Sequence, residues 1–208
     1  VYERTALTLT TEVGGYVKAE QVIASADEAD EQVLVLEPGQ RVTLRVVDEQ
    51  GRPVETDARA EQIEGQSLHP QTLQPGEHLF TDLPSGMVTF EVRLGGAKFR
   101  VEHDTANPNV MLRVPRPARV VVGPLKNGAE PHNLGARAMR LDAADEPFHL
   151  RVGATDAEAE LVVPGRYRVE LVRYSWRGEG EARERVEETI APAQEIEAKA
   201  GELVRIEF

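Results

Sequence analysis

Apolar and polar residues alternate with a period of two along several short stretches of this chain. In Arg41–Val46 every second side chain is apolar, with Arg or Thr between. The same alternation recurs at residues 88–94, 110–114, 166–171 and 204–208. An antiparallel strand with one face on a core and the other in water requires this pattern. The chain is therefore predicted to be all-β.

Residues that favour tight turns separate the predicted strands. Combinations of Gly, Pro, Asn and Asp occur at residues 48–51, 83–86, 126–128 and 163–165. Gly accepts left-handed backbone conformations, Pro fixes φ, and Asn and Asp side chains bond to the turn backbone. These positions predict that short strands are joined by hairpins and corners.

The segment 181–190 is rich in Glu and Arg, which favour helices. Only Val186 and Ile190 share an apolar stripe on such a helix, and a stripe this narrow cannot dock a helix on a core. We therefore expect an exposed hairpin arm there, with a short helix as the alternative.

The chain also repeats itself at an offset of about 80 residues. The matching segments are 51–60 with 128–138, 83–92 with 163–171, 13–16 with 94–97, and 34–38 with 112–115. Residues 39–115 and 116–208 are therefore interpreted as two whole units, and residues 1–38 as the second half of a unit. A whole unit has the size of a small β-sandwich.

Two explanations of the half unit stay open. Residues 1–38 belong to an upstream domain, or they supply extra strands to the first sandwich. We favour the second for this chain, because an isolated half sandwich could not bury its apolar face. The predicted domains are then residues 1–115 and 116–208. Pro115 and Pro117 make the link between them semi-rigid, because each fixes φ and lacks an amide proton.

Two motifs of the first unit carry a family resemblance. Residues 46–54 read VVDEQGRPV, and residues 80–86 read FTDLPSG. They resemble the strand ending V-x-D-x-x-G-x-P-V and the later F-x-x-L-P-x-G-x-Y hairpin of the carboxypeptidase regulatory-like domain. The likeness covers residues 41–115 and, more weakly, 117–208. The second unit lacks the Asp of the first turn but keeps the family's aromatic residue as Tyr167.

This resemblance implies both a fold and a general role. The family has a transthyretin-like (prealbumin-like) sandwich of seven antiparallel strands. The resemblance thus implies two tandem antiparallel Ig-like/transthyretin-like β-sandwiches. The family's members are mostly accessory modules of secreted and cell-envelope proteins, where they position neighbouring domains or bind ligands. Such patterns specify a fold far more than a function.

Composition and charge exclude several functional classes. The chain has 208 residues, a formal net charge of −12 and no Cys. Like charge raises the cost of approaching nucleic-acid phosphates or an anionic membrane, so neither is an expected partner. Without Cys, the chain has no disulfides, Cys-ligated zinc, iron–sulfur cluster or thiol catalysis. No stretch approaches the roughly 18 apolar residues of a membrane span, so no membrane insertion is expected.

The polar residues show no pattern typical of catalysis or of metal binding. None of the four Ser residues lies in a G-x-S-x-G motif, and no two His residues have the i, i+2 or i, i+4 spacing of a metal site. The acidic stretch Asp27–Glu31 lacks the turn Gly of an EF-hand loop and is interpreted as a solvated turn. We therefore predict no enzyme activity, no catalytic residue, no metal and no cofactor.

Tyr174 and Trp176 are the candidate ligand-binding residues. They follow the predicted strand 167–172, so the only Trp of the chain is expected in or beside a loop. Exposed there, the two rings could stack on a sugar or anchor a protein partner. The alternative, which we favour, is that Trp176 caps the end of the sandwich core.

These observations predict a non-enzymatic spacer or protein-interaction module of a larger secreted or cell-envelope protein. Its partners are neighbouring domains of the same polypeptide or another protein. The alternative is a carbohydrate- or peptide-binding accessory module of an extracellular hydrolase, with a glycan or peptide at Tyr174 and Trp176. The chain starts at Val1 and shows no signal peptide, so we interpret it as a processed form or a fragment. A secreted, periplasmic or cell-surface location is expected from the resemblance.

Overall fold

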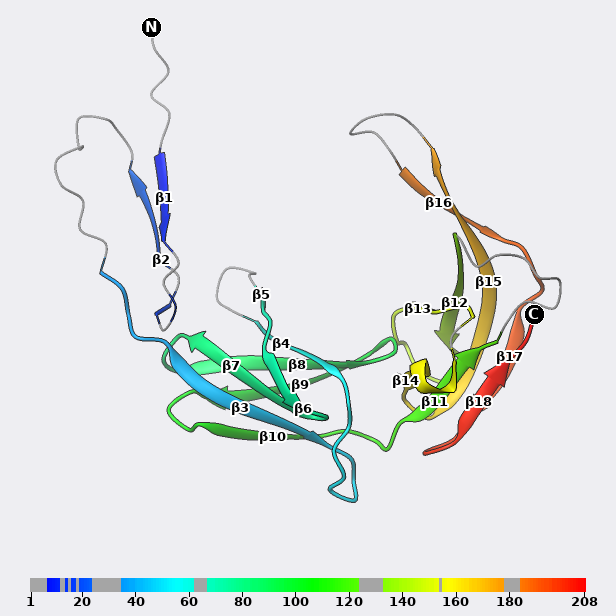
Figure 1. The fold of residues 1–208 in the computed structure, drawn as a ribbon, viewed down its shortest axis with the longest axis horizontal. Helices are drawn as coiled ribbons and strands as arrows, with labels where there is room; N and C mark the ends of the chain where they lie inside the picture. The colour runs from blue at the N-terminus through cyan, green and yellow to red at the C-terminus, as the bar shows by residue number, and fades with distance from the viewer. Residues whose placement is uncertain are drawn as a thin grey trace, which may run out of the picture. The chain divides into compact units, whose positions relative to one another are not determined.

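The computed structural model describes residues 7–11, 14, 16–17, 19–23, 35–61, 67–123, 133–153, 155–177 and 184–208 (Figure 1). Within these ranges the regular structure consists of strands and one three-residue 3-10 turn, Asp156–Glu158. The prediction of an all-β fold is confirmed. No helix in the described ranges is long and apolar enough to cross a membrane.

Residues 40–113 form two four-stranded sheets. The first has the strand order β10-β3-β7-β6 and the second the order β5-β4-β8-β9. Their strands are β3 (Gln40–Val47), β4 (Asp57–Glu61), β5 (Ser67–Leu68), β6 (Gln71–Gln74), β7 (Glu77–Leu83), β8 (Met87–Leu94), β9 (Ala97–Asp104) and β10 (Asn109–Arg113). The predicted turns at 48–51 and 83–86 follow β3 and separate β7 from β8.

The two four-stranded sheets pack face to face. Val42 and Leu44 of β3 are fully buried, as the alternation predicts. Phe80 of β7 meets Phe90 of β8 edge to face, with ring centroids 5.0 Å apart. Because these rings come from different sheets, the contact shows that the sheets share one apolar core.

Residues 118–206 form a three-stranded sheet, β14-β11-β18, and a five-stranded sheet. The five-stranded sheet has the order β13-β12-β15-β16, and β17 also pairs with β15. The strands are β11 (Ala118–Val122), β12 (Leu134–Arg140), β13 (Phe148–Leu150), β14 (Glu160–Val162), β15 (Gly165–Arg177), β16 (Glu184–Thr189), β17 (Gln194–Ala198) and β18 (Leu203–Ile206).

A single apolar core joins these two sheets. Val120 and Ile206 of the three-stranded sheet belong to the same buried cluster as Ala138 and Val169 of the five-stranded sheet. The second β-sandwich predicted from the sequence is therefore present. Strands β11 and β18 depart from the predicted antiparallel pattern, because they run parallel, with Arg119 opposite Leu203.

The expected hairpin arm is confirmed for the part of residues 181–190 that the structure describes. Residues 184–189 form strand β16, which pairs antiparallel with β15 from Val172 to Arg177. The short helix that was the alternative is therefore wrong for these residues. Backbone pairing with β15 overrides the helix propensity of Glu and Arg.

The first part of the chain contains a short hairpin. Strands β1 (Leu7–Thr11) and β2 (Ala19–Ile23) pair antiparallel in a two-stranded sheet. The Val17 amide donates a hydrogen bond to the Glu37 carbonyl at 2.9 Å. The acidic stretch at residues 27–31 lies outside the described residues.

By its contacts the chain divides into two compact units. The first comprises Val1–Arg45, Ala58–Glu91 and Arg100–Leu112, and the second comprises Val46–Asp57, Val92–Phe99 and Arg113–Phe208. This division crosses β3, β4, β8, β9 and β10. The boundary at residue 115 and the assignment of residues 1–38 stay predictions.

Candidate functional site on the outer face of the five-stranded sheet

Tyr174 and Trp176 lie on strand β15, close to its last residue, Arg177. Tyr167 and Val169, further back on β15, point into the core. Side chains alternate along a strand, so residues at even positions belong to the opposite, outer face. Glu187 is the cross-strand partner of Tyr174, and Arg185 is the partner of Trp176. These four residues therefore share the outer face of the β15–β16 pair.

Trp176 does not cap the core. Its side chain is 57% exposed, so the capping that we favoured from the sequence is wrong. The physical reason is the length of β15. Pairing with β16 carries the strand as far as Arg177, past the last residue that β12 pairs, Arg173. Trp176 consequently stands on a two-stranded arm and not over the core.

Two neighbours, His149 and Arg185, hold the Tyr174 ring in place. A hydrogen bond of 2.9 Å joins its hydroxyl to Nδ1 of His149 on β13, and the two rings meet edge to face. The guanidinium carbon of Arg185 lies 3.8 Å from the ring centroid, which is a cation–π contact. Burial raises the pKa of the Tyr174 hydroxyl above its ordinary value. Tyr174 is therefore a fixed part of the face, and its neighbour Trp176 is the exposed part.

Gly135 on β12 makes room for this ring. A Cβ atom at this position would lie 2.3 Å from the Tyr174 hydroxyl oxygen and 2.7 Å from its Cε2 atom. Any other residue therefore forces the ring to move. Sequence reasoning missed both Gly135 and His149 as members of the site. The available signal was a Gly inside the strand, which often marks a close approach.

Charged side chains of both signs alternate across the same face. Arg137 on β12 forms an ion pair with Glu170 on β15 at 2.5 Å, and Glu170 also contacts Arg168 at 3.0 Å. On the other side, Glu187 lies 3.3 Å from Arg185 and 3.6 Å from His149. The hydrogen bond from Arg137 holds the pKa of the Glu170 carboxyl below its usual range. The face thus presents donors and acceptors side by side.

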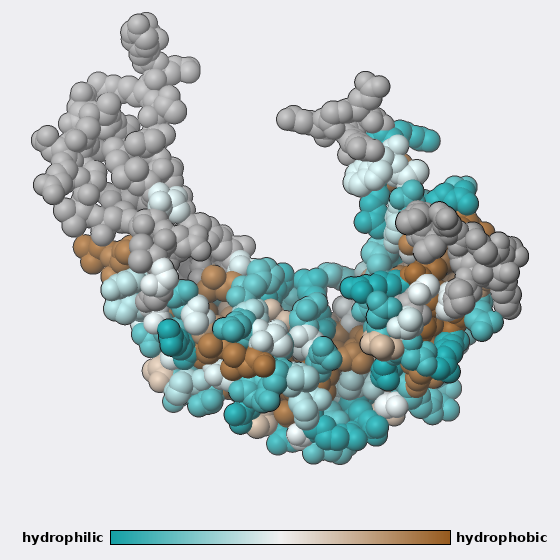
Figure 2. All heavy atoms as spheres, viewed as in Figure 1, coloured by the Kyte–Doolittle hydropathy of each residue, from teal (hydrophilic) through white to brown (hydrophobic). Residues whose placement is uncertain are grey.

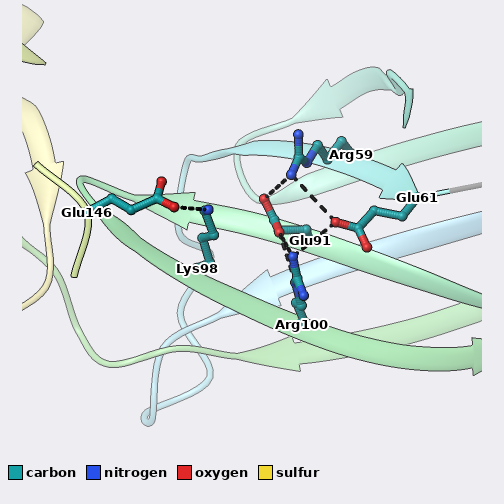
Figure 3. Close-up of polar contacts among 6 residues, drawn as sticks. All are labelled: Arg59, Glu61, Glu91, Lys98, Arg100 and Glu146. Atoms are coloured by element: carbon teal, nitrogen blue, oxygen red, sulfur yellow. Dashed lines mark hydrogen bonds and ion pairs between the residues drawn. The ribbon is translucent and has the colours of Figure 1, made fainter. Parts of the chain in front are cut away.

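A second polar cluster lies on the outer face of the sheet β5-β4-β8-β9 (Figure 3). Glu91 on β8 is completely buried, although its neighbours Phe90 and Val92 point into the core. Arg59 Nη2 lies 2.7 Å from one carboxylate oxygen of Glu91, and Arg100 Nη2 lies 2.8 Å from the other.

Glu61 completes this cluster, with its Oε1 3.2 Å from Arg100 and 3.5 Å from Arg59. The hydrogen bond to Glu91 raises the pKa of the Arg100 guanidinium above its ordinary value. Guanidinium groups bond to both oxygens of the Glu91 carboxylate, so the cluster joins strands β4, β8 and β9 through their side chains. Figure 3 also shows Lys98 and Glu146, both in the second compact unit, with Nζ and Oε1 2.7 Å apart.

Sequence reasoning missed the Glu91 cluster. The alternation in residues 88–94 correctly places Glu91 on the face opposite the core, but it predicts exposure to water for that face. Burial of Glu91 depends on Arg59 and Arg100 from neighbouring strands, which a single strand's pattern does not reveal.

Exposed apolar side chains are scattered across the described residues. On the face drawn in Figure 2, hydrophilic residues predominate and hydrophobic ones form small groups between them. The large apolar residues with at least 40% exposure in the described ranges are Tyr16, Val35, Leu73, Met87, Met111, Met139, Leu141 and Trp176. The described ranges also contain no group of three or more His, Asp or Glu side chains placed to hold a metal ion.

No protein-family model matches this chain, and no curated protein matches it. Among solved structures it is similar to a leucine-rich repeat protein from Bacteroides thetaiotaomicron VPI-5482, at 12% identity and a TM-score of 0.33 over 82% of this chain and 26% of that one. It is also similar to the Bacillus anthracis TIE protein, at 12% identity and a TM-score of 0.29 over 97% of this chain and 41% of that one.

A streptococcal ancillary pilin is similar at 13% identity and a TM-score of 0.31, over 95% of this chain and 73% of that one. The chain spans less than half the length of the first two structures. At these TM-scores the likenesses carry no argument about function. The carboxypeptidase regulatory-like resemblance stays a prediction.

Proposed function

We propose that this chain is a non-enzymatic spacer and interaction module of a larger secreted or cell-envelope protein. The observation that supports the proposal is the pair of β-sandwiches, each with its own buried apolar core. Among the described strands, no sheet combines a strand from residues 40–113 with one from residues 118–206. Rigid bodies joined by Pro115 and Pro117 hold neighbouring domains at a set distance.

Two local features support membership of the carboxypeptidase regulatory-like family. The turn after β3 is closed by a hydrogen bond from the Gly51 amide to the Asp48 carbonyl at 3.0 Å, and Gly51 has a φ of 79°. Gly86, with a φ of 105°, ends the corner that leads into β8. These are the Asp–Gly turn and the Pro–Gly corner on which the resemblance rests.

Calorimetry of the full chain and of its two predicted domains tests the spacer proposal. Residues 1–115 and 116–208, made separately, should each unfold cooperatively, and the full chain should show two separable or weakly coupled transitions. Loss of folding in both halves would contradict two domains. A single transition of the full chain that neither half reproduces would contradict them as well.

A second candidate function is a carbohydrate- or peptide-binding accessory module attached to an extracellular hydrolase. The exposure of Trp176 beside a held Tyr174 favours it. The fluorescence of the single Trp, measured while polysaccharides or peptides are added, tests this candidate. An unchanged spectrum with every ligand would contradict it.

A further inference from the structure

We propose that Trp176, Arg185 and Glu187 bind a neutral pyranose unit of a polysaccharide, and that Tyr174 is the residue that positions Arg185. This inference rests on the second candidate function and names the ligand class for its site. All of these residues lie on strands β15 and β16 of one sheet.

Trp176 is the stacking surface. The residue is more than half exposed, and the apolar C–H face of a pyranose stacks on an indole ring. Backbone pairing of Trp176 with Arg185 fixes its Cα position on the strand pair.

Arg185 and Glu187 supply the polar contacts. The Arg185 guanidinium only donates hydrogen bonds and the Glu187 carboxylate only accepts them. Their nearest atoms are 3.3 Å apart, and their side chains are 44% and 27% exposed. Each sugar hydroxyl both donates and accepts, so adjacent hydroxyls of one ring can pair with both residues. The two groups are therefore complementary to a polyol.

The charges of the face favour a neutral sugar over a polyanion. Beside Trp176, Arg185 is matched by Glu187, and further along the face Glu170 lies between Arg137 and Arg168. A polyanion at Trp176 gains little from a guanidinium group whose charge is already matched, and it meets the Glu187 carboxylate. A protein partner is also less favoured, because its hot spots need a desolvated apolar pocket, whereas the cross-strand neighbours of Trp176 and Tyr174 are charged.

Tyr174 acts through Arg185. Its ring lies against the Arg185 guanidinium, and its hydroxyl is hydrogen-bonded to His149. The hydroxyl end of the ring occupies the space that a side chain at Gly135 would need. The Gly135→Ala substitution puts a Cβ within 2.3 Å of the hydroxyl oxygen and so displaces the ring. This change tests positioning without altering any residue that touches the sugar.

The experiment is a titration of the full chain with soluble neutral polysaccharides, namely mixed-linkage β-glucan, arabinoxylan and soluble starch. We expect a saturable change in the fluorescence of the single Trp with at least one of them. Isothermal titration calorimetry then measures the Kd of each variant for that polysaccharide. Trp176→Ala should raise Kd by about tenfold or more, as removal of a stacking anchor does. Glu187→Gln and Gly135→Ala should each raise Kd by about threefold or more.

Met139→Ala is the matched control. Met139 is 42% exposed and lies on the outer side of β12, because its neighbour Ala138 belongs to the core. This variant should bind like the parent chain. Circular dichroism and melting of each variant separate loss of binding from loss of folding.

Other outcomes overturn the inference in distinguishable ways. Salt-sensitive binding to polygalacturonate, without binding to the neutral polymers, shows an anion site. Binding to peptides alone contradicts the sugar but leaves an accessory binding module. If no ligand binds, both the sugar site and the accessory binding module are contradicted. The calorimetry of the two domains still tests the spacer proposal separately. Unchanged affinity of Gly135→Ala, with the ring shown displaced by NMR, contradicts the role of Tyr174.

Discussion

The Tyr167 hydroxyl donates a hydrogen bond of 2.5 Å to the Val163 carbonyl, four residues earlier in the chain. The Tyr167 ring is buried in the core of the second sandwich and meets Phe148 edge to face. The bond spans the corner between β14 and β15, so it ties the corner to the core. Such a bond from a buried tyrosine back to the upstream backbone is the tyrosine corner of Ig-like sandwiches.

Tyr167→Phe should destabilise the second sandwich by about 1–2 kcal/mol. The ring still fills the core, but the substitution removes the hydroxyl and leaves the Val163 carbonyl without this donor. Urea unfolding followed by circular dichroism measures the change. An effect below about 0.3 kcal/mol would contradict the importance of the corner, and Tyr174→Phe is the control for loss of a less buried hydroxyl.

The same hydroxyl predicts a loss of stability in alkali. Burial raises the pKa of Tyr167 from 10 to about 12. The folded state thus favours the protonated form, so this contribution is complete below pH 10 and is lost as the pH rises through about 12. The urea midpoint of the parent chain should fall between pH 10 and 12. In Tyr167→Phe the urea midpoint should fall less over this pH range. An equal fall in both proteins would show that the Tyr167 hydroxyl is not the group responsible.

Asp48 predicts the opposite dependence at acid pH. Its Oδ1 accepts hydrogen bonds from the backbone amides of Gln50 and Arg52, and its Oδ2 pairs with the Arg52 side chain. Burial alone would raise the pKa of the Asp48 carboxyl, but these bonds outweigh it and hold the pKa below its ordinary value. The carboxylate therefore stabilises the fold above its unfolded pKa, and this contribution is lost as the pH falls through the lower folded pKa.

Asp48→Asn tests this dependence. The variant should unfold more easily at pH 7, and its stability should change less than that of the parent chain from about pH 4 downward. Chemical denaturation at several pH values measures both effects. Asp57→Asn, an exposed position on β4, is the control. If the stability of the Asp48 and Asp57 variants depends on pH in the same way, the Asp48 carboxylate is not the source of the acid dependence.

Much of this fold was predictable because alternation and turn chemistry are local. The pattern in Arg41–Val46 lies within β3, and the turn at Asp48 closes as its Asp and Gly predict. The outer end of β15 was not predictable from its own residues. It exists because residues 184–189 pair with it, although Glu and Arg there favour a helix. The roles of Gly135 and Glu91 likewise depend on side chains from neighbouring strands.

Glu91→Gln should destabilise the first sandwich by about 2–3 kcal/mol. The neutral Gln amide cannot balance the charges of Arg59 and Arg100. Its NH2 group only donates hydrogen bonds, so it would face a guanidinium donor at the place where a carboxylate oxygen accepted a hydrogen bond. Equilibrium urea unfolding measures the loss. Glu61→Gln is the matched control on the same face. It should cost less than about 1 kcal/mol, because Glu61 is partly exposed and solvent screens its pairs.

The triple variant Arg59→Leu, Glu91→Leu, Arg100→Leu shows whether the network itself stabilises the fold. Replacing a buried ion pair or triad as a whole by apolar side chains is often neutral or stabilising, whereas removing one member is costly. In this cluster Glu91 is the buried member, Arg59 and Arg100 are partly exposed, and the variant retains Glu61. We expect the triple variant to be more stable than Glu91→Gln. A triple variant that is less stable than Glu91→Gln would contradict this expectation, and it would show that the charged cluster itself stabilises the first sandwich.

The arm that carries Trp176 should open more readily than the sheet from which it extends. Val169 and Leu171 pair with β12 on one side and are buried. Ser175 to Arg177 pair with β16 on one side but lie beyond the last residue paired with β12. Few buried contacts hold such a segment, so it opens at a low free energy.

Amide hydrogen exchange by NMR should give protection factors at least about tenfold lower for residues 175–177 than for residues 169–171. Equal protection would contradict a separate arm. A rise in protection at residues 175–177 on adding the bound polysaccharide would link this opening to the sugar site.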